Sequence, residues 1–315
     1  MGRVWKSLPE TEEEMKKITA IMLTLIMSMA MIAGCGSGSA TDSKPDANGA
    51  GSGADASAGG VLKVIDVDLS EEQYAFGVDK DQTDLLEQAN QYIKEIQENG
   101  EFDRICNNYF GDGEPVPVES AAEDSSKDQL VVATNAGFEP FEYMKGDKYL
   151  GIDMEIAKGL AEKLGKELVI ANMDFDAVCL AVGQHKCDIA MAGLTIKESR
   201  KKYVTFTDSY YNASQRLIVK SDDTEFDSMK DADSVHKALM AKDSSVKIGV
   251  QNGTTGQLYC NGDDEAGFEK LPAQAIGYKN GSLACQDLIN GNLDYVIIDS
   301  APAKCITDAL NIQNK

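Results

Sequence analysis

Short apolar runs that alternate with amphipathic helical stripes are the feature that most narrows the folds open to this chain. The strand-like runs are 130–134, 168–171, 189–192, 247–250, 275–278 and 295–298. Helical patterns lie between them, and in the second half of the chain they begin near Thr255, Ser282 and Ala301. Alternation of this kind predicts parallel sheets covered by helices, which is an α/β fold class.

The helix after the first strand can be placed from its apolar spacing. Ile156, Leu160 and Leu164 recur at helical intervals. Asp153 stands where an N-cap is expected, and Gly165 stands where the helix should end.

Residues that could contact a ligand follow four of the predicted strands. They are Asn135 and Phe138, Gly193 and Thr195, Thr254 and Thr255, and Asp299. Open α/β sheets bind ligands beyond the carboxyl ends of their strands. The pattern therefore predicts a cleft between two lobes.

The run from Cys187 to Tyr211 carries the most specific chemistry. Gly193, Thr195 and Arg200 can offer a backbone carbonyl, a hydroxyl and a guanidinium to one small ligand. These groups suit a free α-amino acid. Arginine can donate two parallel hydrogen bonds to the carboxylate, and the carbonyl and hydroxyl oxygens can accept hydrogen bonds from the ammonium. An ordinary strand and loop with a surface arginine is the alternative that these residue types leave open.

The same run, CDIAMAGLTIKESRKKYVTFTDSYY, resembles bacterial extracellular solute-binding proteins of family 3, which serve polar amino-acid importers, and it is most similar to glutamine-binding proteins. The resemblance continues in 130–143, 149–165, 246–256 and 293–303. It implies a two-lobe, type II periplasmic-binding-protein fold. It also implies capture of a free amino acid by lobe closure and delivery to the permease subunits of an ABC importer.

The resemblance also implies ligand anchors. Arg200 would bind the α-carboxylate, with hydroxyl or backbone N–H donors from Thr195, Thr254 and Thr255 and the start of the following helix. A surface ion pair for Arg200 and plain turn chemistry for the threonines are the alternatives.

The α-ammonium would meet the Gly193 carbonyl and the Asp299 carboxylate. Asp299 could instead cap the helix from Ala301. Phe138 and Phe175 would enclose the ligand side chain, or they could be ordinary core residues.

Three positions depart from the glutamine-binding relatives. Asn135 replaces an acidic residue that reads the end of the side chain, Gln251 replaces a lysine, and Ile298 replaces a histidine. These departures argue against glutamine itself as the ligand, and they leave the α-amino and α-carboxylate anchors intact.

The order of the segments is unusual for this family. Residues 74–111 resemble the family's C-terminal helices, yet they precede the first strand at Leu130. Their apolar stripes are Leu85, Leu86, Ala89, Tyr92, Ile93 and Ile96, then Phe102, Ile105 and Tyr109. We interpret this order as a circular permutation, with 111–128 as the linker. Domain swapping and an inactive gene product are the alternatives.

The permutation sets the expected domains. Lobe 1 comprises 73–209, and lobe 2 combines 61–68 with 215–315. The chain is expected to cross between the lobes near 68–72 and 210–214.

The front of the chain resembles a bacterial lipoprotein signal. Lys16 and Lys17 precede an apolar stretch that ends in the lipobox Ile32-Ala33-Gly34-Cys35. We expect residues 1–34 to be removed, with Met15 as the true start, and Cys35 to be lipidated. Residues 35–60 then form a flexible tether, and the protein is extracytoplasmic and lipid-anchored to the membrane.

Charge and metal-binding residues exclude several functions. The net charge of −22 argues against a nucleic-acid partner. Besides Cys35 there are six cysteines, with no CxxC motif, and two histidines. We therefore expect neither a metal nor a cofactor. These six cysteines can pair in 15 ways, and buried free thiols are the preferred interpretation if the host lives without oxygen.

The main alternative function is an exported enzyme similar to cyclohexadienyl dehydratase, and a sensory domain is a further one. An enzyme needs an acid–base group in the cleft. Glu139 and Glu142 are candidates, and both fit a solvated loop equally well. The Arg200 and Asp299 anchors favour amino-acid capture, so no enzymatic activity is expected.

Overall fold

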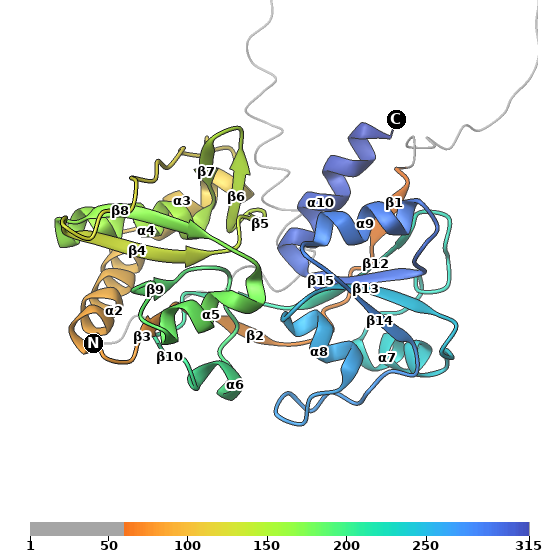
Figure 1. The fold of residues 1–315 in the computed structure, drawn as a ribbon. Coiled ribbons are helices and arrows are strands. Elements are labelled where there is room, and N and C mark those ends of the chain that lie inside the picture. Colours follow the sequence, from red (N-terminus) through yellow and green to blue (C-terminus); the bar gives the residue numbers. More distant parts are fainter. Residues whose placement is uncertain (1–59, 315) are drawn as a thin grey trace, which may run out of the picture. The chain divides into compact units, whose positions relative to one another are not determined.

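The computed structural model describes residues 60–314. The predicted signal, the lipidation site Cys35 and the tether up to residue 59 lie outside these residues. Within the described part of the chain, no helix is long and apolar enough to cross a membrane. The described residues form two lobes, each built on a five-stranded sheet (Figure 1).

Lobe 1 is defined by the sheet that holds the first predicted strand. In spatial order its strands are β10 (Val204–Phe206), β3 (Gly77–Asp79), β9 (Ile189–Ala190), β4 (Gln129–Thr134) and β8 (Glu167–Asn172). The pairs β10–β3 and β3–β9 are antiparallel, whereas β9–β4 and β4–β8 are parallel. A small sheet of β5 (Gly137–Phe138), β6 (Glu142–Lys145) and β7 (Lys148–Leu150) completes this lobe.

Lobe 2 repeats this pairing pattern. Its strands are β1 (Leu62–Val64), β12 (Gln215–Lys220), β15 (Tyr295–Asp299), β13 (Lys247–Gln251) and β14 (Gln274–Tyr278). Again the first two pairs are antiparallel and the last two are parallel. The sequence prediction of an α/β fold with parallel strands is thus confirmed in both lobes.

Helices cover the sheets by burying apolar side chains, with the exception of the short helix α6, which buries none. The helices of lobe 1 are α2 (Thr83–Glu98), α3 (Glu101–Phe110), α4 (Ile152–Leu164), α5 (Phe175–Gly183) and α6 (Glu198–Lys201). Those of lobe 2 are α7 (Ala232–Met240), α8 (Thr255–Asn261), α9 (Gly281–Ile289) and α10 (Ser300–Gln313). Successive residues of β15 point to opposite faces. Ile297 packs in the cluster with α7 and α8, and Ile298 packs in the cluster with α9 and α10.

Two adjacent strands join the lobes. β2 (Glu72–Tyr74) and β11 (Tyr211–Ala213) form an antiparallel pair outside both main sheets. The chain before β2 belongs to the sheet of lobe 2, and the chain after it belongs to the sheet of lobe 1.

The front segment packs within its own chain. Asn108 and Tyr109 of α3 donate to the carboxylate of Glu155 on α4, at 3.2 and 2.8 Å. Asn90 of α2 accepts from the backbone N–H of Asp208 at 2.8 Å. The interpretation of 74–111 as a permuted family C-terminus stays a proposal from the sequence.

Both ends of the described chain lie in lobe 2. The side chain of Asn311 on α10 accepts from the N–H of Leu62 and donates to the carbonyl of Leu62, each at 2.9 Å. Residues 249 positions apart in sequence are therefore neighbours in this lobe.

Two local predictions were wrong. Asp153 does not cap α4, since Gly151 is the N-cap; its side chain turns inward and accepts from Gly193 N–H and Tyr210 O–H. Strand β9 ends at Ala190 rather than Ala192, because the chain turns toward Gly193, which has φ +53°. The prediction that Gly165 ends α4 is confirmed by its left-handed φ of +69°.

Among residues 60–314, four cysteines are buried free thiols, namely Cys179, Cys187, Cys260 and Cys285, whereas the free thiols of Cys106 and Cys305 are partly exposed.

Candidate ligand-binding site

A pocket between the lobes brings together eight of the nine residues selected from the sequence. Its walls lie close together and leave about 10 Å³ of free volume between them, because the lobes already contact each other across the cleft. The lining residues are Phe138, Phe175, Gly193, Thr195 and Arg200 from lobe 1, and Gln251, Thr254, Thr255 and Asp299 from lobe 2. Asn135 is not in the lining, but it bonds to Gln251, which is.

Arg200 lies on the short helix α6 with its guanidinium at the pocket wall. One nitrogen donates to the carbonyl of Thr195 at 2.7 Å, and another donates across the cleft to the carbonyl of Gly253 at 3.0 Å. The guanidinium also lies 5.1 Å from the ring centroid of Phe175. Removal from water lowers the pKa of Arg200. The alternative of a surface ion pair is wrong, since its guanidinium bonds to backbone carbonyls beside the pocket.

Asp299 is the last residue of β15 and is buried. Its carboxylate accepts a 2.5 Å hydrogen bond from the Tyr74 hydroxyl and makes no capping bond to α10. Burial, and secondarily the neighbouring Glu72, raise the pKa of Asp299 to about 7. A cation brought next to it would favour the ionised carboxylate.

Glu72 is a buried group at the site that the sequence did not point to. Its carboxylate accepts from the Thr195 hydroxyl at 2.6 Å and from the Gln215 amide at 2.9 Å. Glu72 lies on β2, the strand that crosses between the lobes, and it bonds to Thr195 of lobe 1 and to Gln215 of lobe 2. A lone glutamate in a short polar segment gave no signal of this role.

The threonines divide into two kinds. The Thr254 hydroxyl donates to the carbonyl of Gln251 at 2.8 Å, which is the turn chemistry considered as its alternative. The Thr255 hydroxyl meets the Thr195 hydroxyl across the cleft at 3.2 Å. Thr195 and Thr255 thus place two hydroxyls at the pocket wall, one from each lobe.

Gly193 brings the backbone close to the aromatic wall. A Cβ at this position would lie 2.9 Å from the ring of Phe138, and the φ of +53° is also unfavourable for other residues. The glycine therefore lets the loop after β9 approach the pocket closely.

Asn135 and Gln251 join the lobes at another wall of the pocket. The Gln251 amide nitrogen donates to the Asn135 carbonyl oxygen at 2.9 Å, and the Asn135 amide donates to the backbone carbonyl of Met173 at 2.6 Å. Ile298, the third departure from the glutamine-binding pattern, is buried in the core and is not in the lining.

The acid–base candidates for an enzyme are not among the lining residues. Glu142 is fully buried rather than on a solvated loop, because β6 pairs it with Phe138 of β5. Burial raises the pKa of Glu142, and of the partly buried Glu139.

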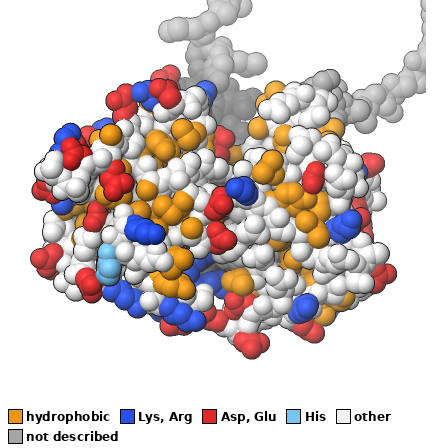
Figure 2. All heavy atoms as spheres, in the orientation of Figure 1, with side chains coloured by type: hydrophobic (Ala, Val, Ile, Leu, Met, Phe, Trp, Pro, Cys, Tyr) orange, Lys and Arg blue, Asp and Glu red, His pale blue; other side chains and the backbone are white. Residues whose placement is uncertain are grey.

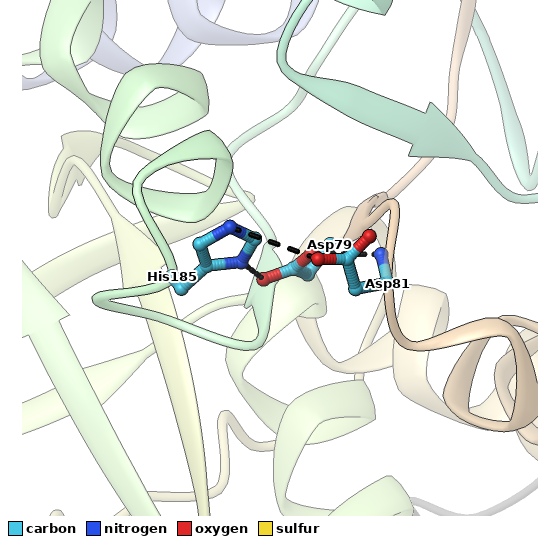
Figure 3. Close-up of side chains that lie close together, drawn as sticks. All are labelled: Asp79, Asp81 and His185. Carbon is cyan, nitrogen blue, oxygen red and sulfur yellow. Dashed lines mark hydrogen bonds and ion pairs between the residues drawn. The ribbon is translucent and has the colours of Figure 1, made fainter.

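A separate cluster in lobe 1 has the composition of a cation site. Asp79, Asp81 and His185 each offer a ligand atom, and these atoms lie within 4.8 Å of one another (Figure 3). His185 is already paired with Asp79 at 2.6 Å, and this bond raises the pKa of His185. We therefore interpret the cluster as an ion-pair network that fastens β3 to the end of α5.

The surface shows charges of both signs. On the face in Figure 2, lysine and arginine side chains are interspersed with aspartate and glutamate over both lobes.

A family comparison covers much of the chain. Residues 130–300 match the model of bacterial extracellular solute-binding proteins, family 3. The front segment described above lies outside the matched residues.

Individual relatives point the same way. The chain is 38% identical over 112 residues to "Arginine-binding extracellular protein ArtP" of Bacillus subtilis, covering 36% of this chain and 44% of the relative. It is 30% identical over 172 residues to "L-arginine-binding protein" of Pseudomonas aeruginosa, covering 54% and 60% respectively. The aligned residues thus span roughly half the length of these relatives.

Two solved structures are also similar. One is an ancestral arginine-binding protein bound to arginine, at 34% identity and a TM-score of 0.49, covering 58% of this chain and 75% of that one. The other is AncCDT-1, an ancestral amino acid-binding protein and precursor of cyclohexadienyl dehydratase, at 30% identity and a TM-score of 0.49, covering 58% and 74%.

Proposed function

This chain belongs to the bacterial extracellular solute-binding proteins of family 3, and on that premise we propose that it captures a free polar amino acid by closing its two lobes. The closed form then delivers the ligand to the permease of an ABC importer. The pocket holds the ligand without changing it chemically.

The observation that carries this proposal is the pairing of opposite charges in one small pocket. Arg200 of lobe 1 and Asp299 of lobe 2 line the same pocket. A free amino acid is a zwitterion, so its carboxylate matches the guanidinium and its ammonium matches the carboxylate. The Thr195 and Thr255 hydroxyls and the Gly193 carbonyl would complete the hydrogen bonds of the two charged groups.

Closure follows from the division of the pocket between lobes. Arg200 donates to Gly253 across the cleft, and Thr255 meets Thr195. A ligand seated between these groups would bind both lobes at once and so favour the closed state. The paired strands β2 and β11 are the connection about which the lobes would move.

The relatives support an amino acid as the ligand, since their names describe arginine-binding and histidine-binding proteins. We propose in addition that the protein works outside the cytoplasm, held at the membrane by a lipid on Cys35. This part rests on the sequence before residue 60.

The experiment that tests the function is a calorimetric titration of residues 36–315 with the twenty amino acids, with light scattering on the same sample. Stoichiometric binding of an amino acid by a monomer is the expected result. A folded monomer that binds none of them would contradict the proposal. Binding confined to a dimer would point to domain swapping.

A further inference from the structure

We infer that Gln251, oriented by Asn135, selects amino acids whose side chain is uncharged and carries a hydrogen-bond donor. This inference rests on the proposed function and specifies its ligand. Glutamine, asparagine, serine and threonine belong to the selected class, whereas arginine and lysine do not.

The first step is the direction of the hydrogen bonds. The backbone carbonyl of Met173 can only accept, so Asn135 must turn its amide nitrogen toward it. The carbonyl oxygen of Asn135 then faces Gln251 and requires a donor. Gln251 must therefore present its amide nitrogen to Asn135 and keep its own carbonyl oxygen, Oε1, for another partner.

The second step is the state of that oxygen. Gln251 is 1% exposed. Its Oε1 is buried and has no hydrogen-bond partner among the described residues, although the residue lines the pocket. A buried acceptor without a donor costs about 1–3 kcal/mol. A ligand that brings a donor to Oε1 removes this cost, and a ligand with an aliphatic side chain does not.

The third step is the charge of the lining. Among the nine lining residues, Arg200 and Asp299 bear charge, and the proposed function assigns both to the two charged groups of the amino-acid backbone. A cationic side chain would then be buried beside a neutral amide without a carboxylate of its own, which is costly. An anionic side chain would place its oxygens against Oε1, which repels them.

Selection is also coupled to closure. Asn135 belongs to lobe 1 and Gln251 belongs to lobe 2, so the bond that orients Gln251 exists when the lobes are together. The acceptor is therefore correctly aimed in the state that encloses the ligand.

The test is a calorimetric panel on the purified protein and three variants. The ligands are L-glutamine, L-asparagine, L-serine, L-threonine, L-methionine, L-arginine, L-lysine and L-glutamate. Gln251→Met removes the acceptor at similar size, and Gln251→Glu adds a carboxylate. Gln286→Glu, at an exposed position of α9 in the same lobe, is the charge-matched control.

For the unchanged protein, at least one neutral donor ligand should bind tenfold or more tightly than arginine, lysine, glutamate and methionine. Gln251→Met should weaken that ligand about tenfold to a hundredfold, since the lost bond satisfied a buried acceptor, and should strengthen methionine. Gln251→Glu should shift the preference toward arginine or lysine, and Gln286→Glu should leave the ranking unchanged.

Tighter binding of arginine than of every neutral ligand by the unchanged protein would overturn this inference while leaving amino-acid capture intact. An equal loss for all ligands in a folded Gln251→Met variant would also overturn it, because that result indicates a structural role. Failure to bind any amino acid would instead contradict the proposed function itself. These outcomes do not depend on whether Gln251→Glu folds.

Discussion

Arg200 offers the largest single test of ligand binding. Its guanidinium donates to the carbonyls of Thr195 and Gly253, and a ligand carboxylate would be a stronger, charged acceptor. We predict that Arg200→Ala weakens amino-acid binding by about 2–5 kcal/mol, as for loss of one partner of a buried charge pair. Calorimetry measures the change.

Arg200→Lys provides the matched comparison, because it keeps the positive charge and loses the planar guanidinium that can bind a carboxylate with two hydrogen bonds. It should bind more weakly than the unchanged protein and more tightly than Arg200→Ala. Equal affinity in the unchanged protein and Arg200→Ala would show that the carboxylate anchor lies elsewhere.

From the raised pKa of the Asp299 carboxyl group we predict that the affinity for the amino acid depends on pH. Burial, with Glu72 nearby, raises the pKa of Asp299 to about 7 in the unliganded protein. A bound ammonium favours the ionised form of Asp299, so below pH 7 ligand binding releases a proton. In that range the affinity falls by up to about tenfold for each unit by which the pH is lowered. Titrations between pH 5 and 8, in buffers with different ionisation enthalpies, measure both effects.

Asp299→Asn should bind more weakly at pH 8 and lose this pH dependence. Burial also raises the pKa of Asp153 to about 7, and Asp153 accepts from Gly193 at the pocket. Asp153→Asn separates the two carboxyls. If only that variant flattened the profile, Asp153 rather than Asp299 would be the coupled group.

Sequence patterns located most of the pocket because its residues follow strands directly. The residues Glu72 and Tyr74 escaped prediction for a physical reason. Glu72 meets Thr195 from 123 positions away, and Tyr74 meets Asp299 from 225 positions away. The spacing of neighbouring residues in the sequence carries no information about contacts over such separations. The sequence showed that Gln251 replaces a lysine of the glutamine-binding relatives. It could not show that the buried side-chain oxygen of Gln251 has no hydrogen-bond partner among the described residues.

At the level of elements, the junction of α3 and α4 depends on one buried carboxylate. Glu155 accepts from the side chains of Asn108 and Tyr109, and from Val116 N–H at 3.2 Å. We predict that Glu155→Ala lowers the free energy of unfolding by about 3–5 kcal/mol, because these three donors, and Arg104 at 3.4 Å, lose a buried charged acceptor. Urea denaturation measures the change.

Glu162→Ala is the control on the same helix. Glu162 is exposed and pairs with Lys158 one turn earlier, an interaction worth under about 1 kcal/mol. Similar losses in the two variants would mean that the Glu155 cluster contributes little to holding α3 in place.

Helical stripes were a dependable guide to elements because they report burial on one face. The stripe with Leu85, Ala89 and Ile93 became the buried face of α2. The proposed cap at Asp153 failed because a carboxylate in the first turn can turn inward as readily as outward. The partners that decided this, Gly193 and Tyr210, come from later in the chain.

For the whole molecule, the main prediction is that the front segment folds onto its own chain. A protease site inserted between the exposed residues Ser125 and Ser126 should allow cleavage of the linker without loss of structure. The two fragments should stay together on gel filtration, keep their circular dichroism and still bind the amino acid, because α2 and α3 are held by packing and by Glu155.

Light scattering of the uncut protein should give a monomer. Separation of the fragments under native conditions, or a dimer in which cleavage leaves two chains interlocked, would contradict packing within one chain. The sequence alone could not decide this, since the same apolar stripes would dock equally well onto a second copy.

The bonds between Asn311 and Leu62 have a mechanical consequence. Whatever precedes residue 60 joins the molecule at lobe 2, beside the end of α10. If the protein is lipidated at Cys35, the tether leaves from lobe 2, and lobe 1 is joined to the attachment point only through lobe 2 and the two strands β2 and β11. The attachment then places no covalent restraint directly on lobe 1, which holds Arg200.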